Sequence, residues 1–558
     1  MSGLRSVGVE LDVPARMRDG IGLRADVYRP AGDGPWPTLL CRTPYGKDAP
    51  EWIDPLAAAR AGFLVVVQDT RGRYASEGEW RPLRHEREDG YDSVEWAARL
   101  PGSNGRVGMY GLSYFGSTQL MAAIDQPPSL AAIAPSLTWC EPLDGLLARG
   151  GALELGLALP WDLLMGVDEL ERTLPAAERE ARVAALLDEH DRLTRNAWWE
   201  LPAGEAMLRR HRTQDLGGLG GDPAVADWSR VAGRHERVTV PSFHIAGWHD
   251  AFLQGTLDNY TALAGLGRSA RLVVGPWTHF QPFADPVGEL CFGLRSSRLG
   301  VPVHPEGDLN DVQLAWFRRQ LDPAASGEPE SASPVRIFVM GRNAWRDETS
   351  WPPERACEQR WFLGAGDVLA AGAPAADAQP SRFVYDPADP VPTRGGSLVM
   401  APEFAAGPFD QAAVEARPDV LVFTSEPLAR ELEVTGRVCV VLHAESSAPS
   451  TDWVARLCDV HPDGRSFNLC DGIVRLGEGA DRLRRIEIDL WSTSNVFLPG
   501  HRLRVQVTSS CFPRWDRNLN TGNQGSVRIE VARQTVYHAG ERPSWIELPV
   551  IPARGDGA

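Results

Sequence analysis

One serine in this sequence stands where a nucleophile could be held on a tight turn. Ser113 lies in the stretch GMYGLSYFGS, residues 108–117, after a short apolar run and before a segment with helical character. Such a turn can expose a reactive hydroxyl, but a corner built of small residues has the same composition. The spacing also departs from the common G-x-S-x-G pattern, which would place glycine where Phe115 stands. On its own, this stretch leaves both interpretations open.

A serine hydroxyl becomes a strong nucleophile only when a base removes its proton and a further group orients that base. Two later segments supply such groups, because Asp250 follows SFHIAGW and His279 follows RLVVGPW. In a parallel sheet, residues that follow the strands gather at one edge, where ligands bind. The order Ser, Asp, His is also that of α/β-hydrolase triads. These placements predict a catalytic triad of Ser113, Asp250 and His279.

Other acids and histidines near these segments have a structural interpretation. Asp69 also ends a predicted strand, but it precedes the serine in the chain, and DTRGR favours an Asp–Arg structural pair. His244 lies within a predicted strand, His249 is adjacent to the candidate acid, and His85 lies at the charged start of a helix. We expect these four residues to support the fold without taking part in catalysis.

The elements that must position the triad alternate between buried strands and helices. The predicted strands are PTLLCRT (37–43), GFLVVVQD (62–69), RVGMYG (106–111), LAAIAPS (130–136), VPSFHIAG (240–247) and ARLVVGP (270–276). EDGYDSVEWAARLP has helical spacing between the second and the third of these strands, and a helix-like stretch separates the last two. Strands and helices in this order predict a parallel sheet covered by helices.

The rest of the chain divides into a helical insertion and a β-rich part. PAAEREARVAALLDEHDRL carries an apolar face at helical spacing, whereas RIEIDL, RLRVQV and SVRIEV alternate apolar and polar residues as half-buried strands do. A polar linker at 322–334 precedes the β-rich part. The expected organisation is an α/β-hydrolase core in 1–140 and 232–350, a helical cap in 141–231, and a jelly-roll-like β-sandwich in 351–558.

Composition narrows the classes of function. The 558 residues carry a net charge of -17, which gives nucleic acid and anionic membranes no electrostatic reason to bind. There is no signal-peptide-like start and no run of about 18 apolar residues. The eight cysteines are scattered without metal-ligand spacing, which favours free thiols over disulfides or zinc and a cytoplasmic location. A hydrolase with the predicted triad requires no metal or organic cofactor. Whether the chain forms a homo-oligomer is left open.

Several motifs resemble one family. TPYGK, DTRGRYASEGEW, GLSYFG, GWHDAF and GPWTH, in this order and spacing, resemble the cocaine esterase and X-Pro dipeptidyl-peptidase family of serine hydrolases. NAWRDETSWPP, DVHPDGRSFNLCDGIVR and SSCFPRWDRNLNTG resemble that family's C-terminal sandwich domain. The family's serine turn follows G-x-S-Y-x-G, so Gly116 matches it and Phe115 occupies a permitted position.

The resemblance implies roles for individual residues. Ser113 would attack the acyl carbon, His279 would carry its proton, and Asp250 would orient the imidazole. The oxyanion would be held by the backbone N–H of Tyr114 and the phenol of Tyr45.

The resemblance also bears on the substrate pocket. Trp161 in the insertion is the candidate for the acyl pocket, and Phe252 in GWHDAF is a second candidate for substrate binding. Peptidase and amino-acid-ester members of the family must hold a free α-amine. Four acidic residues of the insertion could do so, but we expect them on solvated helix faces: Glu141, Asp144, Asp162 and Asp168.

The resulting hypothesis is a serine hydrolase that cleaves carboxylic esters of small or aromatic acyl groups through an acyl-enzyme. Its partners would be small-molecule esters or amides. The alternatives within the same class are an X-Pro dipeptidyl-peptidase and a β-lactam or amino-acid-ester acylase. A more distant alternative is a non-catalytic carbohydrate-binding or assembly protein, because jelly-roll sandwiches also bind sugars.

Overall fold

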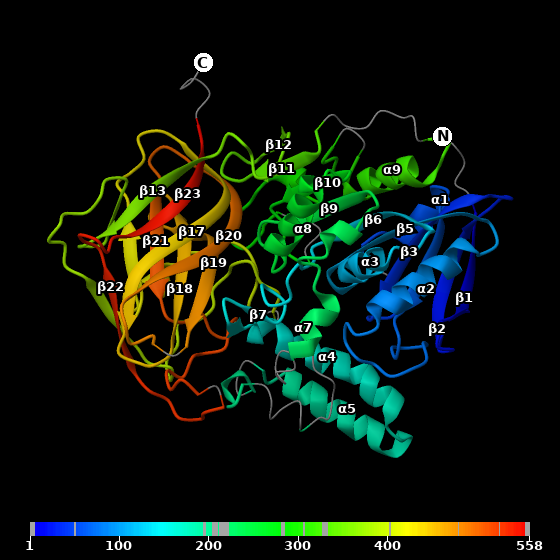
Figure 1. Cartoon of the computed structure of the whole chain (residues 1–558), viewed down its shortest axis with the longest axis horizontal. Helices are drawn as coiled ribbons and strands as arrows, with labels where there is room; N and C mark the ends of the chain where they lie inside the picture. Colours follow the sequence, from blue (N-terminus) through cyan, green and yellow to red (C-terminus); the bar gives the residue numbers. More distant parts are fainter. Residues whose placement is uncertain are drawn as a thin grey trace.

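The structure is a computed structural model of the 558-residue chain. It describes residues 6–48, 52–193, 197–203, 210, 223–280, 285–304, 307–325, 333–400, 403–477, 479–523 and 525–552. An α/β half that contains the N-terminal residues lies beside a β-rich half, and a helical segment lies below the α/β half (Figure 1).

A ten-stranded sheet forms the centre of the α/β half. Its strands are β1 (Val7–Arg16), β2 (Gly22–Pro30), β3 (Trp36–Thr43), β4 (Leu64–Asp69), β5 (Ser103–Leu112), β6 (Leu130–Ser136), β9 (Ser242–Gly247), β10 (Ala270–Gly275), β11 (Val335–Val339) and β12 (Ala344–Glu348). They lie in the order β1-β2-β4-β3-β5-β6-β9-β10-β11-β12. From β4 to β11 the neighbours are parallel, whereas β2 and β12 run antiparallel to theirs. All six strands predicted from apolar runs are present.

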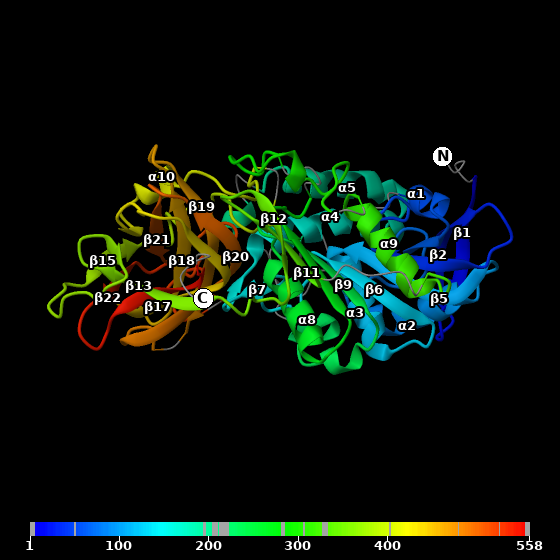
Figure 2. The same cartoon turned by 90° about the horizontal axis from the view of Figure 1, so that it is seen from above.

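Helices cover both faces of this sheet (Figure 2). One face carries α1 (Pro55–Arg60) and α9 (Leu309–Leu321), and the other carries α2 (Glu86–Ala98), α3 (Ser113–Asp125) and α8 (Leu253–Gly265). The helices approach closely, because a Cβ at Gly108 of β5 would lie 2.8 Å from the Phe317 ring of α9. Likewise, a Cβ at Gly90 of α2 would lie 2.8 Å from Ala122 of α3.

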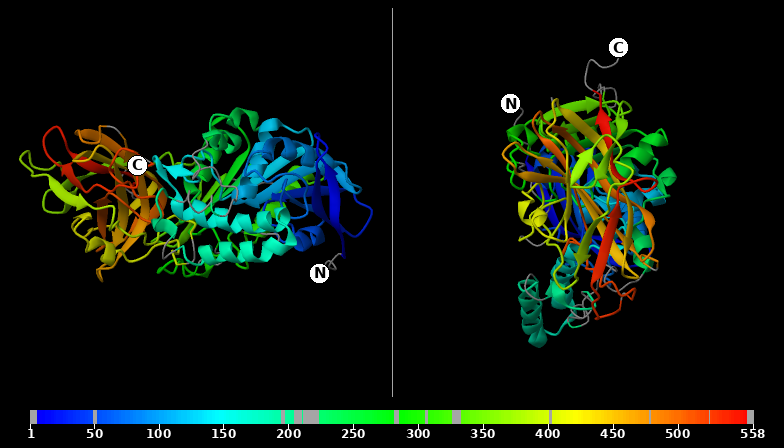
Figure 3. Two further views of the ribbon diagram at one scale, coloured as in Figure 1. Left: turned by 90° about the horizontal axis from the view of Figure 1, so that it is seen from below. Right: turned by 90° about the vertical axis from the view of Figure 1, so that its left-hand side faces the viewer.

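The insertion after β6 is helical, as its apolar spacing predicts. It contains the short strands β7 (Ala148–Arg149) and β8 (Ala152–Leu153), the helices α4 (Leu155–Thr173), α5 (Ala176–His190) and α7 (Pro223–Ser229), and the 3-10 turns η1 (Ala197–Trp199) and η2 (His235–Arg237) near its end. Helices α4 and α5 lie side by side against the α/β half (Figure 3). On the amphipathic face of α5, Leu186 is fully buried. No described helix is both long and apolar enough to cross a membrane.

The C-terminal part is built of strands around a core of its own. They are β13 (Cys357–Gly364), β14 (Val368–Ala370), β15 (Ser381–Tyr385), β16 (Leu421–Thr424), β17 (Leu432–Ser446), β18 (Thr451–Val460), β19 (Ser466–Leu476), β20 (Arg484–Phe497), β21 (Arg502–Thr508), β22 (Ala532–Tyr537) and β23 (Ser544–Ile551). The alternating runs RIEIDL and RLRVQV lie in β20 and β21, and their apolar residues point into this core. A short helix, α10 (Ala412–Glu415), precedes β16.

The third alternating run, SVRIEV, does not form the predicted strand. Val527, Ile529 and Val531 are 65%, 36% and 56% exposed, and β22 begins only at Ala532, where pairing with β15 starts. Alternation buries one face of a segment only if neighbouring strands hold that segment on the core. Among the described residues, SVRIEV has no such strand partner, so its apolar side chains face solvent.

A buried arginine ties the insertion to the β-rich half. The Arg149 guanidinium lies over the Trp491 ring, 3.7 Å from its centroid, and donates to the carbonyls of Asp471 at 2.6 Å and Asp489 at 3.1 Å. The Trp491 indole in turn donates to Asp144 of the insertion at 3.2 Å. The cap therefore rests on the sandwich as well as on the core.

All eight cysteines lie in the described part of the chain and none forms a disulfide. Five of them are buried, whereas Cys291 and Cys357 are exposed and Cys439 is half-buried. The expectation that the cysteines do not form disulfides is confirmed.

Candidate active site

Ser113 lies on the sharp turn between β5 and α3. It is the first residue of α3, and its φ is +57°, a left-handed conformation that residues other than glycine adopt only when their surroundings hold them there. Two hydrogen bonds hold it: the Ser113 N–H donates to the Leu137 carbonyl at 3.1 Å, and the Thr138 hydroxyl donates to the Ser113 carbonyl at 2.8 Å. The turn is thus fixed by the residues that follow the adjacent strand, β6.

Two glycines make room for this turn. Gly111 has a φ of +135°, and a Cβ there would lie 2.2 Å from the Phe115 ring. A Cβ at Gly116 would lie 2.8 Å from Thr138 and 2.9 Å from the Ser136 carbonyl. Phe115 itself is buried and packs edge-on against Tyr45. The G-x-S-x-x-G spacing therefore follows from packing, because the close approach to β6 is made at position 116.

Asp250 and His279 meet behind the serine. The His279 Nδ1 and the Asp250 Oδ2 are 2.6 Å apart, and both side chains are buried. The other carboxylate oxygen, Oδ1, accepts from the Phe252 N–H at 2.7 Å. A carboxylate oxygen only accepts, so Nδ1 carries the hydrogen and Nε2 is left to face the cavity.

Glycines and a tryptophan position the loops that carry this pair. The Trp277 side chain and backbone fold over the ends of β9 and β10, where a Cβ at Gly247 would lie 2.4 Å from the Trp277 carbonyl. A Cβ at Gly275 would lie 2.3 Å from the indole. The glycines in GWHD and GPWTH are therefore needed for close packing, and this packing brings Asp250 and His279 together.

The loop after β3 carries Tyr45 into the same site. Asp69 at the end of β4 holds this loop, because its Oδ1 accepts from the Lys47 N–H at 2.7 Å and its Oδ2 from the Ala75 N–H at 3.2 Å. Burial raises the pKa of Asp69 to about 6. The expected Asp–Arg pair is wrong in detail, since Asp69 bonds backbone amides and Arg71 pairs with Asp89. The structural role of Asp69 stands.

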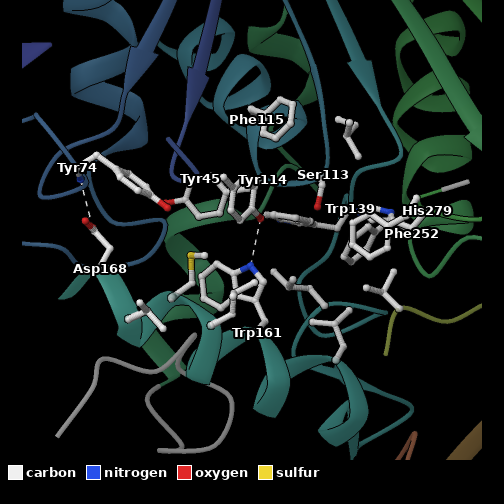
Figure 4. A pocket seen from close by; sticks show the side chains of 18 of the residues that line it. Tyr45, Tyr74, Ser113, Tyr114, Phe115, Trp139, Trp161, Asp168, Phe252 and His279 are labelled. Carbon is white, nitrogen blue, oxygen red and sulfur yellow. Dashed lines mark hydrogen bonds between the residues drawn. The ribbon is translucent and has the colours of Figure 1, made fainter. Parts of the chain in front are cut away.

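Tyr45 and Trp161 are joined by a hydrogen bond. The Trp161 indole N–H of α4 donates to the Tyr45 phenol oxygen at 3.1 Å, as Figure 4 shows. An indole N–H can only donate, so the phenol accepts in this contact and its own hydroxyl hydrogen is not used there. The cap therefore orients Tyr45 through Trp161.

Tyr114 presents its backbone and its side chain to different partners. As the second residue of α3, its N–H lies in the first turn, where a helix has no acceptor for it. Its phenol is buried, donates to Glu86 at 2.9 Å and accepts from the Leu83 N–H at 2.8 Å. Burial raises the pKa of Glu86 against the effect of its ion pair with Arg42.

These groups line one cavity of about 520 Å³ between the core and the cap (Figure 4). Its wall consists of Tyr45, Tyr74, Leu112, Ser113, Tyr114, Phe115, Trp139, Leu146, Leu157, Trp161, Leu164, Met165, Val167, Asp168, Glu171, Leu187, Phe252, His279, Phe280 and Val399. Most of these side chains are apolar or aromatic. Phe252 lies edge-on to both His279 and Trp139. All seven residues predicted for the site therefore line the cavity or lie directly behind it.

The expectation that the acidic residues of the cap lie on solvated faces is wrong for two of the four. Asp162 and Asp168 are buried, whereas Asp144 and Glu141 are half-buried. Asp144 accepts from the Trp491 indole at 3.2 Å, and Glu141 is paired with Arg230 at 2.8 Å. Sequence periodicity could not show the partners of Asp144 and Asp168, because these partners come from other elements of the fold.

Asp168 is the one of these acids that reaches the cavity. Its carboxylate lies 3.3 Å from the buried guanidinium of Arg73 and accepts from the Tyr74 N–H at 3.2 Å. Arg73 also donates to the carbonyls of Pro44 and Met165, and its guanidinium lies over the Trp80 ring. DTRGR thus supplies a cation that neutralises Asp168 and joins the cap to the Tyr45 loop.

The other histidines stay outside the main cavity. His244 is buried within β9 and bonds Ser242 at 3.0 Å, and His249 is buried with neither ring nitrogen bonded among the described residues. Burial lowers the pKa of each to about 3, so both are neutral.

One group of described residues has the donor types of a metal site. Single ligand atoms of Asp459, His461 and His501 lie within 4.8 Å of one another in the sandwich. His501 Nδ1 is already 2.8 Å from the Asp459 carboxylate. These three residues do not line the cavity that holds Ser113.

The chain is similar to known hydrolases over its whole length. Residues 19–281 match the X-Pro dipeptidyl-peptidase (S15 family), and residues 328–547 match the X-Pro dipeptidyl-peptidase C-terminal non-catalytic domain. The chain is 36% identical to the cocaine esterase of Rhodococcus sp. (strain MB1 Bresler), over 99% of this chain and 100% of that protein.

Two solved structures share the fold throughout. An aminopeptidase from the marine sediment archaeon Thaumarchaeota archaeon has a TM-score of 0.79 and 26% identity, over 99% of this chain and 97% of that chain. An alpha-amino acid ester hydrolase has a TM-score of 0.77 and 25% identity, with the same coverage of 99% and 97%. The similarity includes both the α/β half and the β-rich half.

The packing of the serine turn makes a prediction about stability. Gly111→Ala should lower the free energy of unfolding by about 3 kcal/mol or more, because it adds a steric clash with Phe115 to the cost of a left-handed backbone. Gly105→Ala is the matched control on the same strand, with a φ of +83° and nothing within 4 Å of its Cβ. It should cost about 1 kcal/mol. If urea unfolding showed equal losses of unfolding free energy in Gly111→Ala and Gly105→Ala, this account would be contradicted.

Proposed function

This chain belongs to the X-Pro dipeptidyl-peptidase and cocaine esterase family of serine hydrolases, and on that premise we propose that it cleaves carboxylic esters. The acyl groups would be small or aromatic, and the reaction would pass through an acyl-enzyme. One observation carries the proposal: Ser113, on its left-handed turn, shares a cavity with His279, which is 2.6 Å from Asp250. The non-catalytic alternative has no comparable support, since the relatives are hydrolases.

The proposed reaction has two steps. The Ser113 hydroxyl attacks the ester carbonyl while His279 Nε2 takes its proton, and Asp250 stabilises the imidazolium through Nδ1. The C–O bond to the alcohol then breaks, and His279 returns the proton to the leaving oxygen. Water, deprotonated by the same histidine, next attacks the acyl-serine and releases the carboxylic acid.

Two groups would stabilise the negative charge that develops on the carbonyl oxygen. The Tyr114 N–H lies in the first turn of α3, where the helix dipole also favours negative charge. The Tyr45 phenol lines the cavity beside it and is oriented by Trp161. Donors fixed in advance are effective because they need not reorganise during the reaction.

The wall of the cavity favours an uncharged acyl group. Its side chains are mainly leucine, valine and aromatic residues, including Trp161 and Phe252. A free α-amine would require an uncompensated carboxylate. Asp168 is compensated by Arg73, which leaves Glu171 at an exposed position as the remaining acid in the wall. This arrangement supports an ester of a neutral acid over a substrate with an α-amine.

The cytoplasm is the proposed location. None of the eight cysteines forms a disulfide, which supports this location because a reducing compartment keeps thiols from being oxidised.

A covalent probe tests the nucleophile. A fluorophosphonate should label the wild-type protein at one site, and Ser113→Ala should abolish the label, because the probe requires an activated serine. Labelling is read by intact-protein mass and peptide mapping. Ser117→Ala, a buried serine in the same helix, is the control and should still be labelled. Undiminished labelling of Ser113→Ala would rule out this assignment.

The two tyrosines should respond differently to removal of the hydroxyl. Tyr45→Phe should lower kcat about 100- to 1000-fold with little change in KM, because the oxyanion exists only in the transition state. Tyr114→Phe should mainly lower stability, by about 1–3 kcal/mol, since it removes the phenol partner of Glu86 Oε1 and of the Leu83 N–H while the Tyr114 backbone N–H remains. Steady-state kinetics and thermal unfolding distinguish the two effects.

Trp161→Phe provides a further check on Tyr45. It should lower kcat less than Tyr45→Phe does, and it should have little additional effect in the Tyr45→Phe background, because it acts through that phenol. Additive effects would show that Trp161 contributes independently.

A small substrate panel tests the ester assignment. p-Nitrophenyl acetate and p-nitrophenyl benzoate should be cleaved with kcat/KM well above that for Ala-Pro-p-nitroanilide, because Arg73 compensates the buried carboxylate of the wall, Asp168, and the other acid, Glu171, lies at an exposed position. Preferential cleavage of the anilide would instead support the dipeptidyl-peptidase alternative.

A further inference from the structure

A second cavity adjoins the first at the histidine. It has a volume of about 290 Å³ and shares Leu112, His279 and Phe280 with the cavity that holds Ser113. The rest of its wall consists of Trp52, Arg298, Leu299, Leu309 and Asn310. His279 therefore lies between a large apolar cavity and a smaller cavity whose wall includes one arginine, Arg298.

That cation, Arg298, is buried without an acidic partner. Its side chain is 5% exposed, and its guanidinium lies over the Trp52 ring, 4.8 Å from the centroid. Among the residues that the structure describes, none forms a hydrogen bond or an ion pair with this guanidinium, and its Nη1 is fully buried. A buried charge without a partner is costly, which is why such groups are normally paired.

Other buried arginines of this chain follow that rule. Arg42, Arg73 and Arg514 are equally buried, and each lies within 3.3 Å of a carboxylate: Glu86, Asp168 and Asp471 respectively. Arg298 lacks such a contact although it faces a cavity. An anion that entered the cavity would supply the missing partner.

Two acids associated with Arg298 or its cavity already have other hydrogen-bond partners. The Asp250 carboxylate attracts the Arg298 guanidinium electrostatically, but its hydrogen bonds go to His279 and to the Phe252 N–H. Asp308, beside the cavity residue Leu309, caps α9 by accepting from the N–H groups of Asn310 and Asp311. Burial lowers the pKa of Arg298 to about 10, so the guanidinium stays protonated at neutral pH.

We propose that this second cavity is a subsite for a carboxylate carried by the leaving-group half of the ester. The substrate class would be esters in which a hydroxycarboxylic acid supplies the alcohol. This inference rests on the proposed function, in which the apolar cavity takes the acyl group. Since His279 delivers the proton to the leaving oxygen, the alcohol half lies next to His279, and Arg298 lines the second cavity together with His279. The carboxylate takes no part in the bond changes and leaves with the alcohol.

A matched pair of esters tests the subsite. The pair is 3-carboxyphenyl benzoate and its methyl ester, 3-methoxycarbonylphenyl benzoate, compared by kcat/KM in the wild type and in Arg298→Met. The substitution should lower kcat/KM at least tenfold more for the carboxylate than for the methyl ester, because only the carboxylate loses a charged hydrogen-bond partner. Comparing the two enzymes cancels the difference in intrinsic reactivity. Arg298→Lys should restore part of the preference.

Two controls separate the subsite from general effects. Arg295→Met removes an exposed charge three residues away and should leave the ratio between the two esters unchanged. In the wild type, 3-hydroxybenzoate should inhibit competitively and 3-hydroxybenzamide should inhibit at least tenfold more weakly. This inhibition test remains decisive if Arg298→Met does not fold.

The contrary outcomes are distinct. An equal loss for both esters in Arg298→Met would mean that Arg298 only supports Asp250, and it would overturn the subsite. A preference for a carboxylate on the acyl half, measured with the phenyl monoester of isophthalic acid, would overturn the assignment to the leaving group. Failure of the proposed function would look different, because neither ester would be cleaved and Ser113 would not react with the fluorophosphonate.

Discussion

The site depends on one backbone constraint, the left-handed conformation of Ser113 at the junction of β5 and α3. A non-glycine residue keeps this conformation only if its surroundings fix it. Here Leu137 and Thr138 bond the Ser113 backbone, and Gly111 and Gly116 allow the close approach that these bonds require. The serine is therefore placed by the edge of the sheet, and the other groups must be brought to it.

The remaining groups reach the serine through loops that buried contacts hold. Trp277 covers the glycine ends of β9 and β10 and so aligns Asp250 with His279. Asp69 and Arg73 hold the loop of Tyr45 from the core side, while Trp161 reaches it from the cap. Each loop is thus fixed by at least one buried polar bond or aromatic contact, which keeps the donors in place before a substrate arrives.

The three parts of the chain depend on one another at this site. The cap supplies Trp161 and Asp168, the core supplies the proposed triad, and the β-rich half supplies Val399 to the cavity wall. Arg149 and Trp491 attach the cap to the sandwich. His279 then separates a large apolar space from a smaller one that holds the unpaired charge of Arg298. In the proposed reaction, these two spaces would take the two halves of the ester.

The sequence by itself placed each proposed triad residue after a strand, and it predicted the helical insertion and most strands. Buried strands, amphipathic helices and glycine turns all leave local patterns in a sequence. The sequence could not determine the partners of Asp168, Asp144 or Arg298, since these depend on elements distant in the chain. SVRIEV shows the same limit, because alternation does not reveal whether a neighbouring strand is present. Only the tertiary structure decided which charges are compensated and which one faces an open cavity, because compensation depends on distances between side chains and on burial.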